Sequence, residues 1–99
     1  MVAPRMVVFI RFHARPGQAA NLQTALEAIL APTRAEPGCV EIHLYKARTD
    51  RALFFIKSVW RDAAAFDVHA NLPHMQVFLA RLPDLIDHEL EAVRTDRID

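Results

Sequence analysis

Histidine is the residue type in this sequence best suited to chemistry. The five histidines are His13, His43, His69, His74 and His88. Imidazole titrates near neutral pH, so a histidine can exchange protons with a substrate. His69 shares a helical stripe with Phe66 and is expected to face a sheet. His74 follows Pro73 at a predicted helix start, where the positive helix end favours neutral imidazole and so a better base. His69 and His74 are therefore the candidate catalytic bases, whereas His13 and His88 are expected in solvent.

Polar and aromatic side chains on two neighbouring predicted strands are the candidate substrate contacts. His43 and Tyr45 share one face of the first strand, and Ser58 and Trp60 share one face of the second. If these faces line a cavity under the helices, they form with Phe66 a hydrogen-bonding rim around an aromatic wall. If they meet a second copy of the chain, they pack an interface. The strand pattern leaves both arrangements open.

Several kinds of site are disfavoured by spacing. His69 and His74 are five positions apart across a helix break, not the i, i+4 pair of helical zinc motifs, so no metal site is expected. Gly17 and Gly38 are the only glycines, which disfavours a glycine-rich phosphate loop for flavin, nicotinamide or ATP. Ser58 lacks the Gly-x-Ser-x-Gly context of a hydrolase nucleophile.

Composition limits the class of protein. The 99 residues suit one domain over 1–99, and 53% of them are hydrophobic. Twelve basic residues balance twelve acidic ones, which argues against nucleic-acid binding and against a polybasic membrane anchor. No apolar run approaches a bilayer span, and the N-terminal residues do not resemble a signal peptide. The lone Cys39 excludes an intramolecular disulfide and is expected to pack as a small residue. A cytoplasmic location is the simplest expectation.

The elements that must position these residues follow from hydrophobic periodicity. Strands are expected over 6–13, 39–46 and 53–60, with a short edge strand within 89–98. A helix over 17–34 is expected between the first two strands, and a pair of helices, over 63–70 and from 73, before the last strand. Pro32 should kink or end the first helix, and Pro83 should interrupt the last. This βαββαβ order predicts an α+β fold of ferredoxin-like type, an antiparallel sheet with helices on one face.

The first predicted strand carries apolar residues on both faces. Val8, Ile10 and Phe12 lie on one face, and Val7 and Phe9 lie on the other. Helices cover only one face of such a sheet, so a second sheet is needed to cover the other. A two-fold homodimer provides that cover most simply.

Four segments together resemble the antibiotic biosynthesis monooxygenase domain, in order from about Val7 to Asp87. They are Arg15-Pro16-Gly17, Arg34-Ala35-Glu36-Pro37-Gly38-Cys39, Trp60-Arg61-Asp62, and His69 with Pro73-His74. The resemblance implies a ferredoxin-like sandwich whose sheets dimerise into an α+β barrel. One departure concerns Ser58, since many relatives carry Glu at that position of the third strand.

The resemblance also implies an activity, oxidation of a quinol or polycyclic phenol by O2 without a cofactor. In that chemistry the enzyme deprotonates an electron-rich aromatic substrate, and the substrate anion itself reduces O2. His69 or His74 would be the base, Trp60 and Phe66 would stack on the substrate ring, and Ser58 or Tyr45 would orient an oxygen.

Other functions occur among proteins that this domain resembles. Haem-degrading relatives resemble one another in an Asn on the first strand, which Val7 to Phe12 lacks. Isomerisation of a phosphorylated sugar also needs a proton-shuttling His, and Arg11, Arg61 or Arg81 could bind its phosphate. A non-catalytic dimer that binds a hydrophobic metabolite or a partner protein is the third alternative, which the absence of the strand Glu favours.

Overall fold

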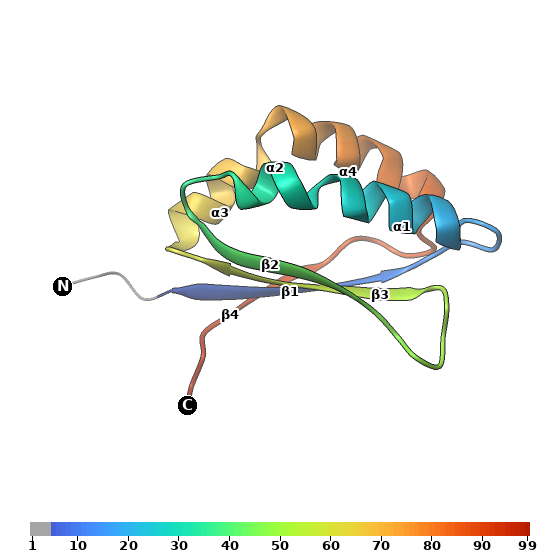
Figure 1. Ribbon diagram of the computed structural model, residues 1–99, viewed down its shortest axis with the longest axis horizontal. Coiled ribbons are helices and arrows are strands. Elements are labelled where there is room, and N and C mark those ends of the chain that lie inside the picture. The colour runs from blue at the N-terminus through green and yellow to red at the C-terminus, as the bar shows by residue number, and fades with distance from the viewer. Residues whose placement is uncertain (1–4) are drawn as a thin grey trace.

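The fold is a four-stranded antiparallel sheet with helices on one face, as predicted. The computed structural model describes residues 5–99. The sheet has the order β2-β3-β1-β4, with the bounds β1 Met6–His13, β2 Cys39–Lys46, β3 Leu53–Trp60 and β4 Ala92–Thr95. The helices are α1 Ala19–Ala28, α2 Leu30–Arg34, α3 Ala63–Ala70 and α4 Pro73–Leu85. Figure 1 shows all four helices on the same side of the sheet. Within residues 5–99, no helix is long and apolar enough to cross a membrane.

The two helix-interior prolines behave differently. The first predicted helix divides into α1 and α2 around Ile29, because Pro32 has no N–H to donate to the Ala28 carbonyl. The interruption expected at Pro83 is wrong, since α4 continues to Leu85. Pro83 removes one helical bond, but the Ile86 N–H donates to the Leu82 carbonyl at 3.0 Å. Burial of Leu82 and Leu85 against the core outweighs that single loss.

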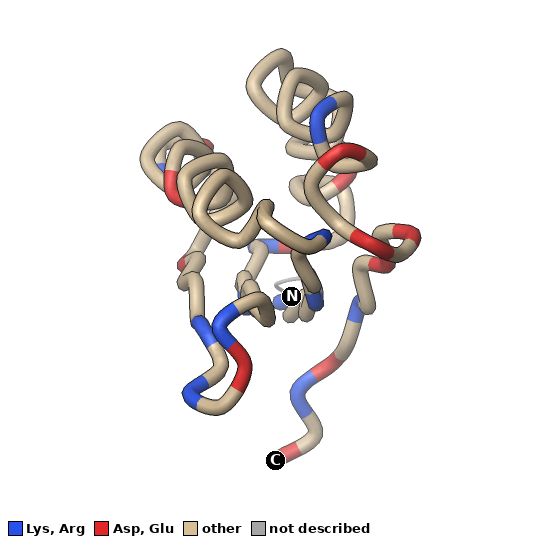
Figure 2. Tube along the Cα trace, turned by 90° about the vertical axis from the view of Figure 1, so that its right-hand side faces the viewer, with Lys and Arg blue, Asp and Glu red and all other residues tan. Residues whose placement is uncertain are grey.

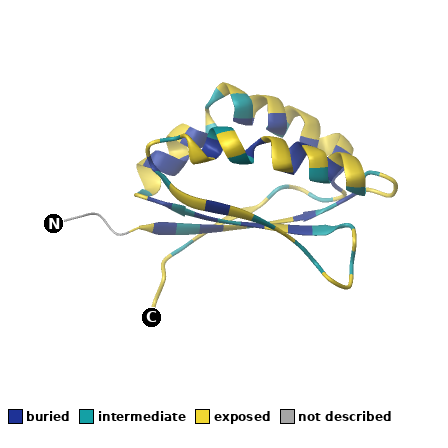
Figure 3. Ribbon diagram, viewed as in Figure 1, coloured by how far each residue is buried: buried dark blue, intermediate teal, exposed yellow. Residues whose placement is uncertain are grey.

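The core lies between the helices and the sheet. Alternate strand residues face the helices, and on β3 they are Phe54, Ile56, Ser58 and Trp60. Figure 3 shows buried segments along the strands and on the helix faces turned toward them. The opposite sheet face carries exposed apolar residues, namely Phe9, Tyr45, Phe55 and Val93.

His13 and His88, expected in solvent, are partly exposed, and they join the end of β1 to the segment after α4. His13 Nδ1 lies 2.7 Å from Asp87 Oδ2, and His13 Nε2 lies 3.3 Å from Asp50 Oδ2. The His13 backbone N–H donates to His88 Nε2 at 3.0 Å. Figure 2 shows acidic residues along the segment after α4. The hydrogen bond to Asp87 raises the pKa of His13, and the same bond lowers the pKa of Asp87.

A close backbone approach sets the position of α3. Gly38, just before β2, packs against Ala65 so closely that a Cβ on Gly38 would collide with the Ala65 side chain. Asp62 caps the helix by accepting a hydrogen bond from the Ala65 N–H at 2.9 Å. These two contacts fix the start of α3 against the sheet edge, and His69 lies four residues after Ala65 on that helix.

The Gly38→Ala variant should be destabilised by about 1–3 kcal/mol, because the added methyl overpacks the contact with α3. Urea unfolding measures the loss. In an Ala65→Gly background, which removes the opposing Cβ, the same substitution should cost clearly less. An equal cost in both backgrounds would show that the contact with α3 is not the cause.

The Asp87→Asn variant should show its largest loss of melting temperature between about pH 4 and pH 6.5. The raised pKa of His13 gives stability that is present below about pH 6.5 and is lost as pH rises through the folded-state value. The lowered pKa of Asp87 gives stability that is present above about pH 4 and is lost as pH falls. Thermal melts from pH 3 to 9 test this, and a maximal difference at pH 9 would refute it.

Candidate active site

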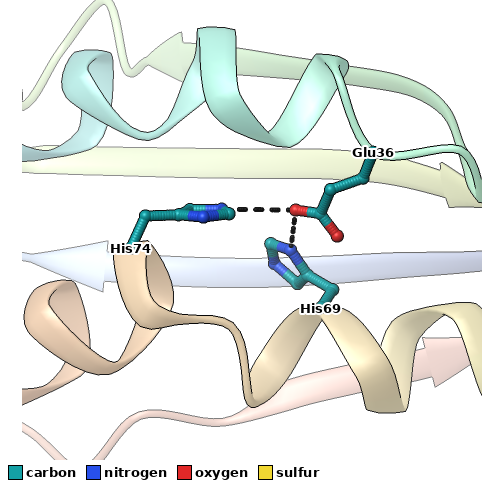
Figure 4. Close-up of side chains that lie close together, drawn as sticks. All are labelled: Glu36, His69 and His74. Atoms are coloured by element: carbon teal, nitrogen blue, oxygen red, sulfur yellow. Dashed lines mark hydrogen bonds and ion pairs between the residues drawn. The ribbon is translucent and has the colours of Figure 1, made fainter.

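Three side chains from separate segments meet between the helices. Glu36 lies in the connection between α2 and β2, His69 lies near the end of α3, and His74 lies in the first turn of α4. His69 Nδ1 is 2.7 Å from Glu36 Oε2, and His74 Nε2 is 3.2 Å from the same oxygen. Figure 4 shows both imidazoles turned toward the Glu36 carboxylate. One oxygen therefore links two candidate bases.

Local structure places each of the three residues. The Glu36 N–H donates to the Thr33 carbonyl, and the Glu36 carbonyl accepts from the Cys39 N–H, each at 3.1 Å. The Glu36 backbone is thus held in a turn before β2. Pro73 disfavours helical backbone at the preceding Leu72, which is extended and separates α3 from α4. That break lets His74 point back toward His69.

Aromatic rings enclose His69. Its ring centroid is 4.6 Å from that of Trp60 and 5.6 Å from that of Phe66. The side chains of His69 and Glu36 are only 6% and 10% exposed. Water therefore screens the contact between them weakly, which strengthens it. Trp60 itself is buried and donates from Nε1 to Ser58 Oγ at 2.9 Å.

The short contact gives His69 the arrangement of a general base. An ionised Glu36 can only accept hydrogen bonds, so the 2.7 Å contact assigns the hydrogen to His69 Nδ1. His69 Nε2 then carries the lone pair, and the carboxylate stabilises the imidazolium that forms on protonation. His74 Nε2 differs, because it is buried near the carboxylate but makes no hydrogen bond of good geometry among the described residues.

The structure brings together five of the seven residues predicted as site residues. His69, His74, Trp60, Phe66 and Ser58 lie on the helix side of the sheet. The other two, His43 and Tyr45, lie on the opposite face, where they pair with Lys57 and Phe55 of β3. Their half-exposed side chains cannot join the others within one chain, so of the two arrangements that the sequence left open, the structure does not show the one in which both strand faces line a cavity under the helices.

Sequence reasoning missed Glu36. Its segment, Glu36-Pro37-Gly38, has the pattern of a connection, and its contact with His69 spans 33 positions. The neighbouring Cys39 is the small packed residue that was predicted. Its partial burial raises the pKa of the thiol, and the Glu36 charge adds to this effect.

A hollow of about 250 Å³ borders the cluster at Glu36. Its lining residues are Glu36, Pro37, Gly38, Arg61, Ala65, Val68 and Leu72. A larger groove, of about 520 Å³, lies near the other end of α4 and is lined by residues that include Leu79, Leu82 and Ile86. Of these two cavities, only the hollow at Glu36 has a residue of the cluster in its lining.

The chain is similar in sequence to known bacterial proteins. The protein named "Putative monooxygenase Rv0793" from Mycobacterium tuberculosis is 33% identical over 86 residues, covering 87% of this chain and 83% of that protein. "Uncharacterized protein sll1783" from Synechocystis is 30% identical over 81 residues, covering 82% of this chain. The match covers 55% of the length of the Synechocystis protein.

Solved structures agree in fold. PA3566 from Pseudomonas aeruginosa superposes with a TM-score of 0.92 at 30% identity, covering 100% of this chain and 99% of that one. Rv0793 superposes with a TM-score of 0.90 at 27% identity, covering 96% of each chain. The family described as antibiotic biosynthesis monooxygenase matches residues 5–81, which include Glu36, His69 and His74. This chain therefore belongs to the antibiotic biosynthesis monooxygenase family.

Proposed function

We propose that this protein is a cofactor-independent monooxygenase that oxidises a quinol or polycyclic phenol with O2. Membership of a monooxygenase family supports the reaction class. The observation that carries the proposal is the 2.7 Å contact between Glu36 Oε2 and His69 Nδ1. It gives the site a base with a free Nε2, in an enclosure of aromatic side chains.

The chemistry balances without a further reductant. His69 Nε2 takes the proton of a substrate hydroxyl, and Glu36 stabilises the imidazolium. The phenolate passes one electron to O2, giving a substrate radical and superoxide, which combine to form a C–O bond. His69 returns its proton to the outer oxygen of this peroxide. Loss of the adjacent C–H proton then forms the carbonyl and breaks the O–O bond, and the departing hydroxide takes up that proton and leaves as water. One oxygen atom thus enters the quinone product and the other enters water.

The surroundings of His69 suit a flat aromatic substrate. Trp60 and Phe66 lie beside the imidazole and would contact the substrate ring. The hollow at Glu36 would be the approach to the site, since it borders the carboxylate. Ser58 accepts a hydrogen bond from the indole N–H of Trp60 and so would hold the Trp60 ring in place beside the substrate. A closed, apolar setting of this kind strengthens the charge stabilisation that deprotonation needs.

The His69→Ala variant should lower O2 consumption with a responsive hydroquinone, naphthol or anthrone by about 10²–10⁴-fold, because it removes the general base. Glu36→Gln should lower it by about tenfold or more, since the amide cannot stabilise an imidazolium. His43→Ala, on the opposite sheet face, is the matched control and should retain full activity. An oxygen electrode with metal-free protein measures the rates.

Two outcomes would argue against this function. Full turnover by His69→Ala would remove His69 as the base. Absence of O2 uptake with every substrate, with aromatic binding still detected by fluorescence of Trp60, the only tryptophan, would indicate a binding module instead.

We further propose that the protein forms a homodimer through the uncovered sheet face. Helices cover one face, and the other exposes Phe9, Phe55 and Val93 across neighbouring strands. A two-fold pairing of these faces would remove that apolar surface from water.

Phe55→Glu should shift the native mass from dimer to monomer, because it places a charge in the middle of this face. Val77→Glu, an equally drastic change at an exposed position of α4 on the helix side, should leave the dimer intact. Sedimentation equilibrium distinguishes the two, and a monomeric wild-type protein would contradict the proposal.

A further inference from the structure

We propose that Glu36, His69 and His74 form a binding site for a divalent transition-metal ion of the Zn²⁺ class. The proposal does not depend on the monooxygenase function, which uses these side chains without a metal. It rests on the donor atoms, their spacing and one buried nitrogen that has no hydrogen-bond partner.

The donor set is that of a metal site with an open position. Two imidazole nitrogens and one carboxylate oxygen hold zinc in several hydrolases, and the same set holds iron in many oxygenases. The three donors would be His69 Nδ1, His74 Nε2 and Glu36 Oε2, from a group whose ligand atoms all lie within 4.8 Å of one another. Metal binding would displace the hydrogen that His69 Nδ1 donates to Glu36 in the metal-free protein. A site with three protein ligands leaves a coordination position for water or for an anionic oxygen of a ligand.

Both donor distances to the Glu36 oxygen can be compared with those around a bound ion. Ligand atoms about 2.0–2.1 Å from one ion lie about 2.9–3.4 Å apart in octahedral or tetrahedral arrangements. The His74 Nε2 to Glu36 Oε2 distance of 3.2 Å is within that range. The His69 Nδ1 to Glu36 Oε2 distance of 2.7 Å needs only a few tenths of an ångström of opening.

His74 Nε2 supplies an independent indication. The atom is buried and makes no hydrogen bond of good geometry among the described residues, although it lies near a carboxylate oxygen. Buried polar atoms nearly always have a partner. An ion bound between the side chains would give this nitrogen a partner.

The surroundings would hold the ligands in place. Trp60 and Phe66 pack against the His69 ring and restrict its rotation. The turn hydrogen bonds on either side of Glu36 fix its backbone. Such supporting contacts orient metal ligands and limit access of water. The expectation that no metal site exists rested on the spacing of the histidine pair alone, and it did not include Glu36.

Titration calorimetry of the chelator-treated, full-length protein with Zn²⁺ tests the site. The wild type should bind one ion per chain. Glu36→Gln and His74→Ala should each weaken binding by at least about tenfold, since each removes a ligand. His43→Ala is the matched control, because His43 also lies near a carboxylate, that of Glu41, but at the surface. It should bind as the wild type does.

Folding and ligand identity need separate readouts. Circular dichroism should show that Glu36→Gln, which preserves the shape of the side chain, remains folded. Co²⁺ used as a probe should give visible absorption bands without a sulfur charge-transfer band, because Cys39 is outside the donor set. Absence of saturable Zn²⁺ binding, unchanged binding by folded Glu36→Gln, or a sulfur charge-transfer band would each overturn the assignment. Because no substrate is present, none of these results depends on whether the monooxygenase proposal is correct.

Discussion

The contact between Glu36 and His69 joins two segments 33 positions apart, and the proposed chemistry depends on it. A carboxylate taken out of water is stabilised only when donors surround it. Here one imidazole donates to it and a second lies 3.2 Å away. The same Glu36 oxygen thus sets the tautomer of His69 and lies 3.2 Å from His74 Nε2.

The fold provides this contact by bringing together the α2–β2 connection, the end of α3 and the start of α4. The close approach of Gly38 to Ala65 lets α3 lie against the start of β2. The break at Pro73 then separates α3 from α4, and the first turn of α4 places His74 3.2 Å from the Glu36 carboxylate. Ser58 accepts the Trp60 indole N–H on the helix side of β3. The carboxylate that contacts His69 and His74 is that of Glu36, in the α2–β2 connection.

Much of the fold was predictable because it follows from local patterns. Alternation of apolar residues gave the bounds of β1, β2 and β3, and Pro32 gave the break between α1 and α2. Pro83 was misjudged because tertiary packing of its neighbours outweighed one lost hydrogen bond. Alternation also showed that His43 and Tyr45 share a face, but only the pairing with β3 shows which side of the sheet they occupy.

The site was less predictable than the fold because its key contact is long-range. A rule based on the spacing of residues along one helix cannot detect Glu36, because Glu36 lies in the connection between α2 and β2. His13 and His88 illustrate the same limit, since their partners come from opposite ends of the chain. Phe66 and His69 were predictable as neighbours because one helix carries both.

The protonation state of His69 in metal-free protein tests the central claim most directly. Long-range ¹H–¹⁵N correlation spectra distinguish the two neutral tautomers of each histidine ring. The hydrogen bond to Glu36 predicts a hydrogen on His69 Nδ1 and a bare Nε2, with a weaker preference in Glu36→Gln, whose neutral amide oxygen is a poorer acceptor. A neutral His69 that carries its hydrogen on Nε2 in the wild type would contradict the account, because the proposed base would then have no free lone pair.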